Sequence, residues 1–119
     1  EGAISESGDN VTEEQGMLNM NDPQTSIIIS QYSQAFLGRS VTLAAKIQEQ
    51  FALQGRVDLG VKQKGLEVLA GSAKPGVLVE IGFINNPSEE AYLNSESGQH
   101  AVALAIFRGI QAYKWDAER

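Results

Sequence analysis

The sequence predicts an α/β fold, and three observations lead to this prediction. The run "VLVEIGF", Val77 to Phe83, is β-branched and apolar on both faces, which is typical of a buried parallel strand. Apolar side chains recur at helical spacing in residues 34–54 and again in residues 98–114. The chain of 119 residues, 42% of them hydrophobic, is long enough for one domain with its own core.

The first 25 residues form a polar, acidic segment that we separate from the rest. They are punctuated by glycine and have little apolar periodicity, which predicts a loop or an inserted segment. Asp22-Pro23 is a turn signal near its end. We therefore divide the chain into residues 1–25 and a folded part, residues 26–119.

The first element expected in the folded part is a long amphipathic helix from Gln34 to Gln54. Gly55 is a natural stop for it. The apolar stripe of this helix is interrupted only by Gln48. The next segment, "RVDLGVKQKG", contains two glycines and is predicted to be a loop, and Leu66–Leu69 is predicted to be a short strand.

The second half of the folded part contains the best-defined signals. We expect a strand at Val77–Ile81 and a short helix at Pro87–Leu93, with Asn86 as its cap and Glu89 completing a capping box. The last helix presents one apolar face that should pack on the sheet: Val102, Ala105, Ile106, Gly109, Ile110 and Tyr113. Two strands make a poor sheet by themselves, so strands upstream of this chain are expected to complete it.

Charge and composition exclude several classes of function. The net charge is −6, and residues 1–26 hold six acidic residues and no basic one, whereas residues 27–119 hold nine of each. No basic stripe exists to displace counterions from a nucleic acid. No apolar run approaches the roughly 18 residues of a membrane span. Without cysteine, thiolate metal sites are excluded, and no signal peptide is visible at Glu1.

Glu80 is the strongest candidate for a functional residue. It is a charged side chain inside an apolar run, near the carboxyl end of the predicted strand, where sites collect in open α/β sheets. Walled by Val79, Ile81 and Phe83, its carboxylate could transfer protons. A structural ion pair explains the position equally well, and the partner would then be one of three basic residues: Arg39, Lys62 or Arg108.

The other chemistry-bearing residues point to no site. His100 is the only histidine, and we expect it to face solvent in the first turn of the last helix. Glu89 and Glu90 are explained by their favourable interaction with a helix dipole. The acidic residues of the leading segment lack the calcium-loop pattern, and Gly55, Gly60 and Gly65 lack the spacing of a phosphate loop.

The stretch "PGVLVEIGFINNPSEEAYL" resembles the closing signature of the N-acetylmuramoyl-L-alanine amidases of the amidase-3 type. Three further segments resemble that family in the same order: "SVTLAAKIQEQF", "LGVKQKGLEVL" and "AVALAIFRGIQAYK". The resemblance runs from about Ser26 to Lys114. It implies a twisted, mostly parallel sheet flanked by helices in three layers, of which this chain holds an incomplete part.

The resemblance also implies a function. The family is zinc-dependent and cleaves the amide between N-acetylmuramic acid and the L-alanine of the peptidoglycan stem peptide. Glu80 matches its catalytic carboxylate, which takes a proton from water and passes it to the leaving amine. Export to the bacterial cell envelope, periplasmic or extracellular, follows from that substrate.

One departure from the family pattern concerns the metal. The family's zinc ligands, two histidines and a glutamate, lie on motifs upstream of the matched region, and His100 is in the wrong place to substitute for one. We therefore expect no metal ligand in this chain, no activity of the chain alone, and a missing N-terminal half as its partner. The alternative hypothesis is a non-catalytic α/β module that binds a protein partner or a glycan.

Overall fold

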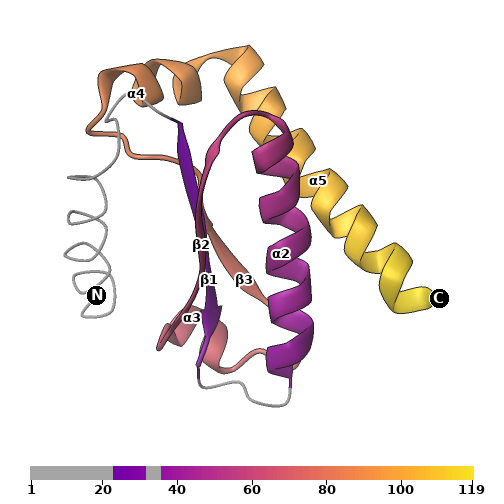
Figure 1. The fold of residues 1–119 in the computed structure, drawn as a ribbon. Coiled ribbons are helices and arrows are strands. Elements are labelled where there is room, and N and C mark those ends of the chain that lie inside the picture. Colours follow the sequence, from indigo (N-terminus) through magenta and orange to yellow (C-terminus); the bar gives the residue numbers. More distant parts are fainter. Residues whose placement is uncertain (1–22, 32–35) are drawn as a thin grey trace.

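The computed structural model describes residues 23–31 and 36–119. Its described elements follow one another as a strand, a long helix, a second strand, a single helical turn, a third strand and two helices (Figure 1). Their bounds are β1 Gln24–Ser30, α2 Leu37–Leu53, β2 Val57–Lys64, α3 Glu67–Ala70, β3 Val77–Glu80, α4 Pro87–Asn94 and α5 Glu96–Glu118. The α/β class is confirmed.

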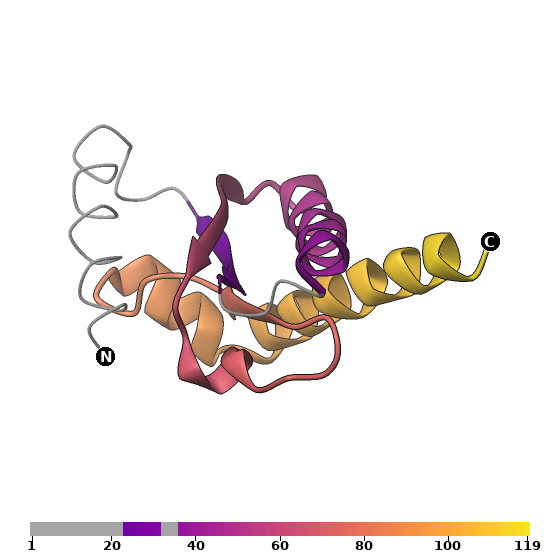
Figure 2. The ribbon, with the colours of Figure 1, turned by 90° about the horizontal axis from the view of Figure 1, so that it is seen from below.

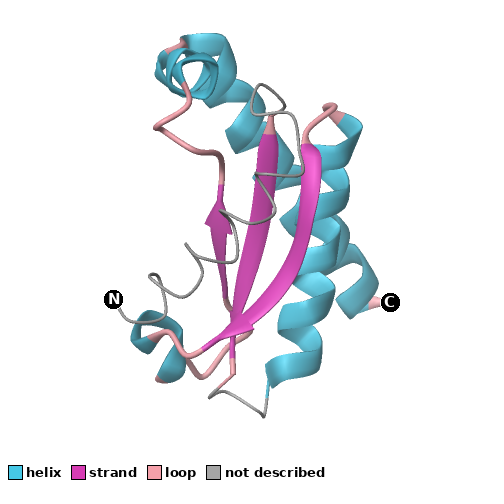
Figure 3. Ribbon diagram, turned by 60° about the vertical axis from the view of Figure 1, so that its left-hand side comes forward, coloured by secondary structure: helices cyan, strands magenta, loops and turns pink. Residues whose placement is uncertain are grey.

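The sheet has three strands in the order β2-β1-β3, with β1 at its centre (Figure 3). β1 and β2 are parallel and are joined through α2, whereas β3 runs antiparallel to β1. The sheet is thus mixed, and the apolar run of β3 does not mark a parallel strand. β3 is a partly exposed strand rather than one buried on both faces.

The central strand β1 was not predicted. All seven of its residues are buried, and Ile27, Ile28 and Ile29 form its middle. A β-branched run flanked by serines is a strand signal, and it lies shortly before helix α2. β1 begins at Gln24, so the proposed boundary after residue 25 falls inside it; the division into segments stays a prediction, because residues 1–22 lie outside the described part.

The long helices cover one face of the sheet (Figures 1 and 2). α2 spans the sheet and α5 packs along α2, where Gly109 lies so close that a Cβ there would be 2.5 Å from the Ile47 Cα. The buried apolar core lies between these elements: Ile27, Ile29, Ala44, Ile47, Phe51, Val102 and Ala105. Two layers of the expected three are therefore provided by the described residues. Ile110, predicted to be on the buried face, is 48% exposed.

Helix α2 confirms the first predicted helix. The prediction that this helix ends before Gly55 is also confirmed. Gly55 has φ +84 directly after the helix, a conformation that glycine adopts without strain. Gln48, the polar interruption of its apolar stripe, is buried and joins α2 to the two strands β1 and β2. Its Nε2 donates to Thr25 O at 3.0 Å and to Asp58 Oδ1 at 2.6 Å.

Two predictions between α2 and β3 are wrong. The segment predicted to be a loop is strand β2, in which Gly60 with φ +92 lies where the pairing with β1 shifts register. A glycine at such an irregularity does not end a strand. The predicted strand Leu66–Leu69 is instead the single turn α3, closed by the hydrogen bond from Ala70 N to Leu66 O at 3.0 Å. Periodicity cannot separate the two in so short an apolar run.

The last two helices lie where the sequence predicts them, but the apolar face of α5 packs mainly on α2 and not on the sheet. Asn86 caps α4, because its Oδ1 accepts hydrogen bonds from Ser88 N at 2.9 Å and Glu89 N at 3.2 Å. The end of α5 is tied to α2 by the ion pair between Asp116 and Lys46, at 2.8 Å. That pair lowers the pKa of Asp116 and raises the pKa of Lys46. Within the described residues, no helix is long and apolar enough to cross a bilayer.

Candidate functional site

Glu80 is the last residue of β3, and its carboxylate lies on the face of the sheet away from α2. Side chains alternate along a strand, and Val79 and Ile81 pack against the apolar core on the α2 side. The predicted apolar wall of Val79 and Ile81 around the carboxylate is therefore wrong. The carboxylate is half-buried on the opposite face.

Ser26 is the residue opposite Glu80 in the pairing of β1 and β3. Its hydroxyl donates a hydrogen bond to Glu80 Oε1 at 3.1 Å, and Ser26 itself is 1% exposed. This contact joins residues 54 positions apart and holds the carboxylate in one orientation. Between described residues, no ion pair joins Glu80 to Arg39 or Arg108, two of the partners considered above.

Arg56 was missed by the sequence analysis and proves to be the buried cation nearest this end of the sheet. It follows the stop of α2, and its side chain is paired with Glu89 of α4 at 2.7 Å. Both side chains are almost fully buried, at 3% and 5% exposure. Glu89 was expected to complete a capping box, but the Asn86 N–H that such a box uses donates to Phe83 O. The Glu89 carboxylate serves the pair with Arg56 instead.

Gly82 lies in the connection between β3 and α4, two residues after Glu80. It has φ +156, and a Cβ at this position would overlap Glu89 Oε2 and lie 3.2 Å from Arg56 Nη2. Only glycine leaves room at this position for the buried ion pair. The strand end that carries Glu80 therefore depends on the pair at the start of α4.

The described residues do not fit a zinc site. In residues 23–31 and 36–119, no three histidine, cysteine, aspartate or glutamate side chains gather as a metal centre would need. Glu80 has a serine as its hydrogen-bond partner, and His100 is exposed near the start of α5. The exposure expected of His100 is confirmed. The acidic residues of the leading segment lie outside the described part.

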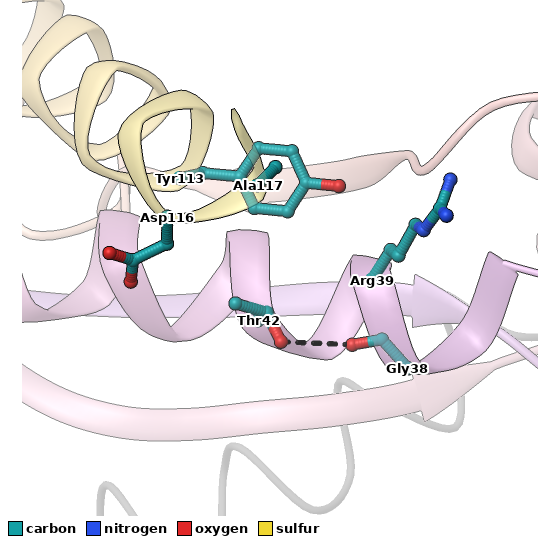
Figure 4. Close-up of a pocket in the computed structure, with 6 residues that line it drawn as sticks. All are labelled: Gly38, Arg39, Thr42, Tyr113, Asp116 and Ala117. Carbon is teal, nitrogen blue, oxygen red and sulfur yellow. Dashed lines mark hydrogen bonds between the residues drawn. The ribbon is translucent and has the colours of Figure 1, made fainter. Parts of the chain in front are cut away.

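A separate surface hollow of about 480 Å³ lies at the other end of α2, between its first turns and the end of α5 (Figure 4). It is lined by Gly38, Arg39, Thr42, Tyr113, Asp116 and Ala117. Asp116 is engaged by Lys46, and the Thr42 hydroxyl donates to Gly38 O within the helix at 3.1 Å. This hollow brings together no set of groups suited to catalysis, so Glu80 remains the candidate.

Comparison with known proteins shows which family the chain resembles. The profile of the amidase-3 family, described as N-acetylmuramoyl-L-alanine amidase, matches residues 10–112. Over 72 residues the chain is 35% identical to the "probable cell wall amidase LytH" of Staphylococcus saprophyticus, covering 60% of this chain and 24% of that protein. Over 89 residues it is 39% identical to an uncharacterised cell wall amidase of Bacillus anthracis, covering 72% of this chain and 17% of that protein.

A solved structure shares the fold. The CwlD amidase of Clostridioides difficile, determined in complex with the GerS lipoprotein, superposes with a TM-score of 0.69 and 28% identity. The match covers 80% of this chain and 48% of that chain. The chain thus spans about half of this amidase structure and a smaller part of the two curated relatives.

Proposed function

Because this chain belongs to the N-acetylmuramoyl-L-alanine amidase family, we propose that it is the C-terminal part of a peptidoglycan amidase. The substrate bond is the amide between N-acetylmuramic acid and the L-alanine of the stem peptide. The enzyme acts in the bacterial cell envelope, periplasmic or extracellular. We call the longer protein that carries this chain the parent amidase.

Glu80 is the catalytic carboxylate in this proposal. The observation that supports it is the position of the side chain: half-buried at the carboxyl end of β3, and oriented by the Ser26 hydroxyl at 3.1 Å. A carboxylate so held accepts a proton from the attacking water and donates it to the leaving amine. Amide hydrolysis needs both transfers, since an amine leaves readily only after it is protonated.

The zinc of the family is held by residues outside this chain in this proposal, because the described residues offer no ligand set. The metal ligands then belong to the N-terminal half of the parent amidase, which also supplies the strands that the sheet lacks. The role of this chain is to present Glu80 to that half. The chain alone is expected to be inactive.

The reaction products test the proposed function. The parent amidase, incubated with purified peptidoglycan, is expected to release peptides that begin with a free L-alanine amino group, without new reducing sugar ends. Mass spectrometry of the released peptides and a reducing-end assay distinguish the two kinds of cleavage. Peptidoglycan bound without any cleavage would favour the non-catalytic module instead.

Ser26→Ala tests the orientation of the carboxylate. Loss of a hydrogen bond to a charged group removes about 1.5–3 kcal/mol, so kcat of the parent amidase is expected to fall about 10- to 150-fold. Ser97→Ala, at an exposed position of α5, is the matched control and should leave kcat unchanged. Equal kcat values for both variants would show that Ser26 does not orient the reacting group.

A further inference from the structure

Arg56 binds three segments of the chain through a single nitrogen atom. Its Nη2 donates to Ile81 O at 2.6 Å, to Glu89 Oε2 at 2.7 Å and to Gln24 O at 3.3 Å. Its guanidinium lies over the Tyr92 ring, 5.4 Å from the centroid. The residue is 6% exposed. One buried cation therefore joins β1, the end of β3 and the first turn of α4.

The acceptors flank the candidate catalytic residue. Ile81 directly follows Glu80, and Gln24 stands two residues before Ser26, the cross-strand partner of Glu80. The peptide after Glu80 is thus held by Arg56, while the carboxylate is held by Ser26. Because β3 ends at Glu80, the peptide after it is not fixed by hydrogen bonds of the sheet.

A buried ion pair is a costly way to stabilise a core. Removing a guanidinium and a carboxylate from water incurs a desolvation penalty, and apolar side chains of similar volume often serve stability equally well. Here the ion pair also packs against Gly82, where any side chain would overlap the Glu89 carboxylate. What apolar residues would not supply is a donor to the Ile81 carbonyl.

We infer that Arg56 and Glu89 are positioning residues for catalysis: Arg56, oriented by Glu89, fixes the peptide that follows Glu80 and thereby the place of its carboxylate. This inference rests on the proposed function. It adds to that function two residues that touch neither the substrate nor the reacting atoms and that act through the Ile81 carbonyl. A small displacement of a reacting group is enough to lower the rate strongly.

The test replaces the pair by apolar residues in the parent amidase. Arg56→Met, Glu89→Met and the double variant are compared for thermal midpoint, kcat and KM. The single variants leave a buried charge unpaired and are expected to be the least stable, whereas the double variant regains most of the thermal midpoint. Its kcat is nevertheless expected to stay about 10- to 100-fold below that of the unaltered enzyme, with KM nearly unchanged.

The matched control is the surface pair of Lys46 and Asp116, which has a similar separation of 2.8 Å. Replacement of both residues by methionine should leave kcat unchanged, because that pair joins α2 to the far end of α5. A double variant at Arg56 and Glu89 with recovered stability and full kcat would overturn the inference.

Two further variants keep the test decisive. If the double variant does not fold, Arg56→Lys is used instead, because it retains the charge for Glu89 but has a shorter reach toward Ile81 O. Reduced kcat in this folded variant supports the inference, and full kcat overturns it.

Glu80→Gln separates the two proposals. An active Glu80→Gln enzyme would refute the catalytic role of Glu80 itself, whereas an inactive one beside fully active Arg56 variants would refute only the positioning role.

Discussion

Glu80→Gln is expected to lower kcat of the parent amidase by about 10²- to 10⁴-fold, the usual contribution of a general acid–base residue. Glutamine keeps the size of the side chain and an oxygen that can accept the Ser26 hydrogen bond. It cannot take up and release a proton. The fold and the melting temperature should therefore remain, and steady-state kinetics on peptidoglycan measures the loss.

Glu90→Gln is the matched control for that measurement. Glu90 is an exposed acid in the first turn of α4, so its replacement removes the same charge without altering the strand end. A Glu80→Gln enzyme with the kcat of the Glu90→Gln control would show that the carboxylate of β3 is structural.

Among glycine-to-alanine substitutions next to Glu80, Gly82→Ala is expected to lower the free energy of unfolding most. The new Cβ would overlap Glu89 Oε2 and lie 3.2 Å from Arg56 Nη2, so that the buried ion pair has to separate. Separating a buried pair costs about 3–5 kcal/mol. That is a large share of the roughly 5–15 kcal/mol that stabilises a typical domain.

Urea denaturation of the two glycine variants checks this expectation. Gly71→Ala is the control, because a Cβ at Gly71 meets nothing within 4 Å and its φ of −91 suits an alanine. Similar denaturation midpoints for Gly82→Ala and Gly71→Ala would mean that the backbone at residue 82 shifts without disturbing Arg56 and Glu89.

The sequence predicted several features whose cause is local. Asn86 followed by Pro87 predicts the start of α4, and Gly55 predicts the end of α2, because capping depends on residues within one turn. Glu80 could be singled out because a charge inside an apolar strand needs a partner or a role. These features need no knowledge of distant residues.

The remainder of the site depends on contacts between distant segments. Ser26 lies 54 residues from Glu80, and Arg56 lies 33 residues from Glu89, so neither pairing has a local signature. Strand β2 was missed because Gly60 was read as a loop signal, although pairing with β1 accommodates it within the strand. Tertiary context overrides local preference in such places.

The zinc content of the Glu80→Gln parent amidase distinguishes a proton-transferring carboxylate from a metal ligand. In the proposed function, Glu80 is the proton-transferring carboxylate and the zinc ligands lie outside this chain. Elemental analysis after dialysis against metal-free buffer should therefore find the same zinc per molecule in Glu80→Gln as in the unaltered enzyme, although the variant is inactive. Loss of the zinc together with the activity would make Glu80 a metal ligand and contradict its proposed role in proton transfer.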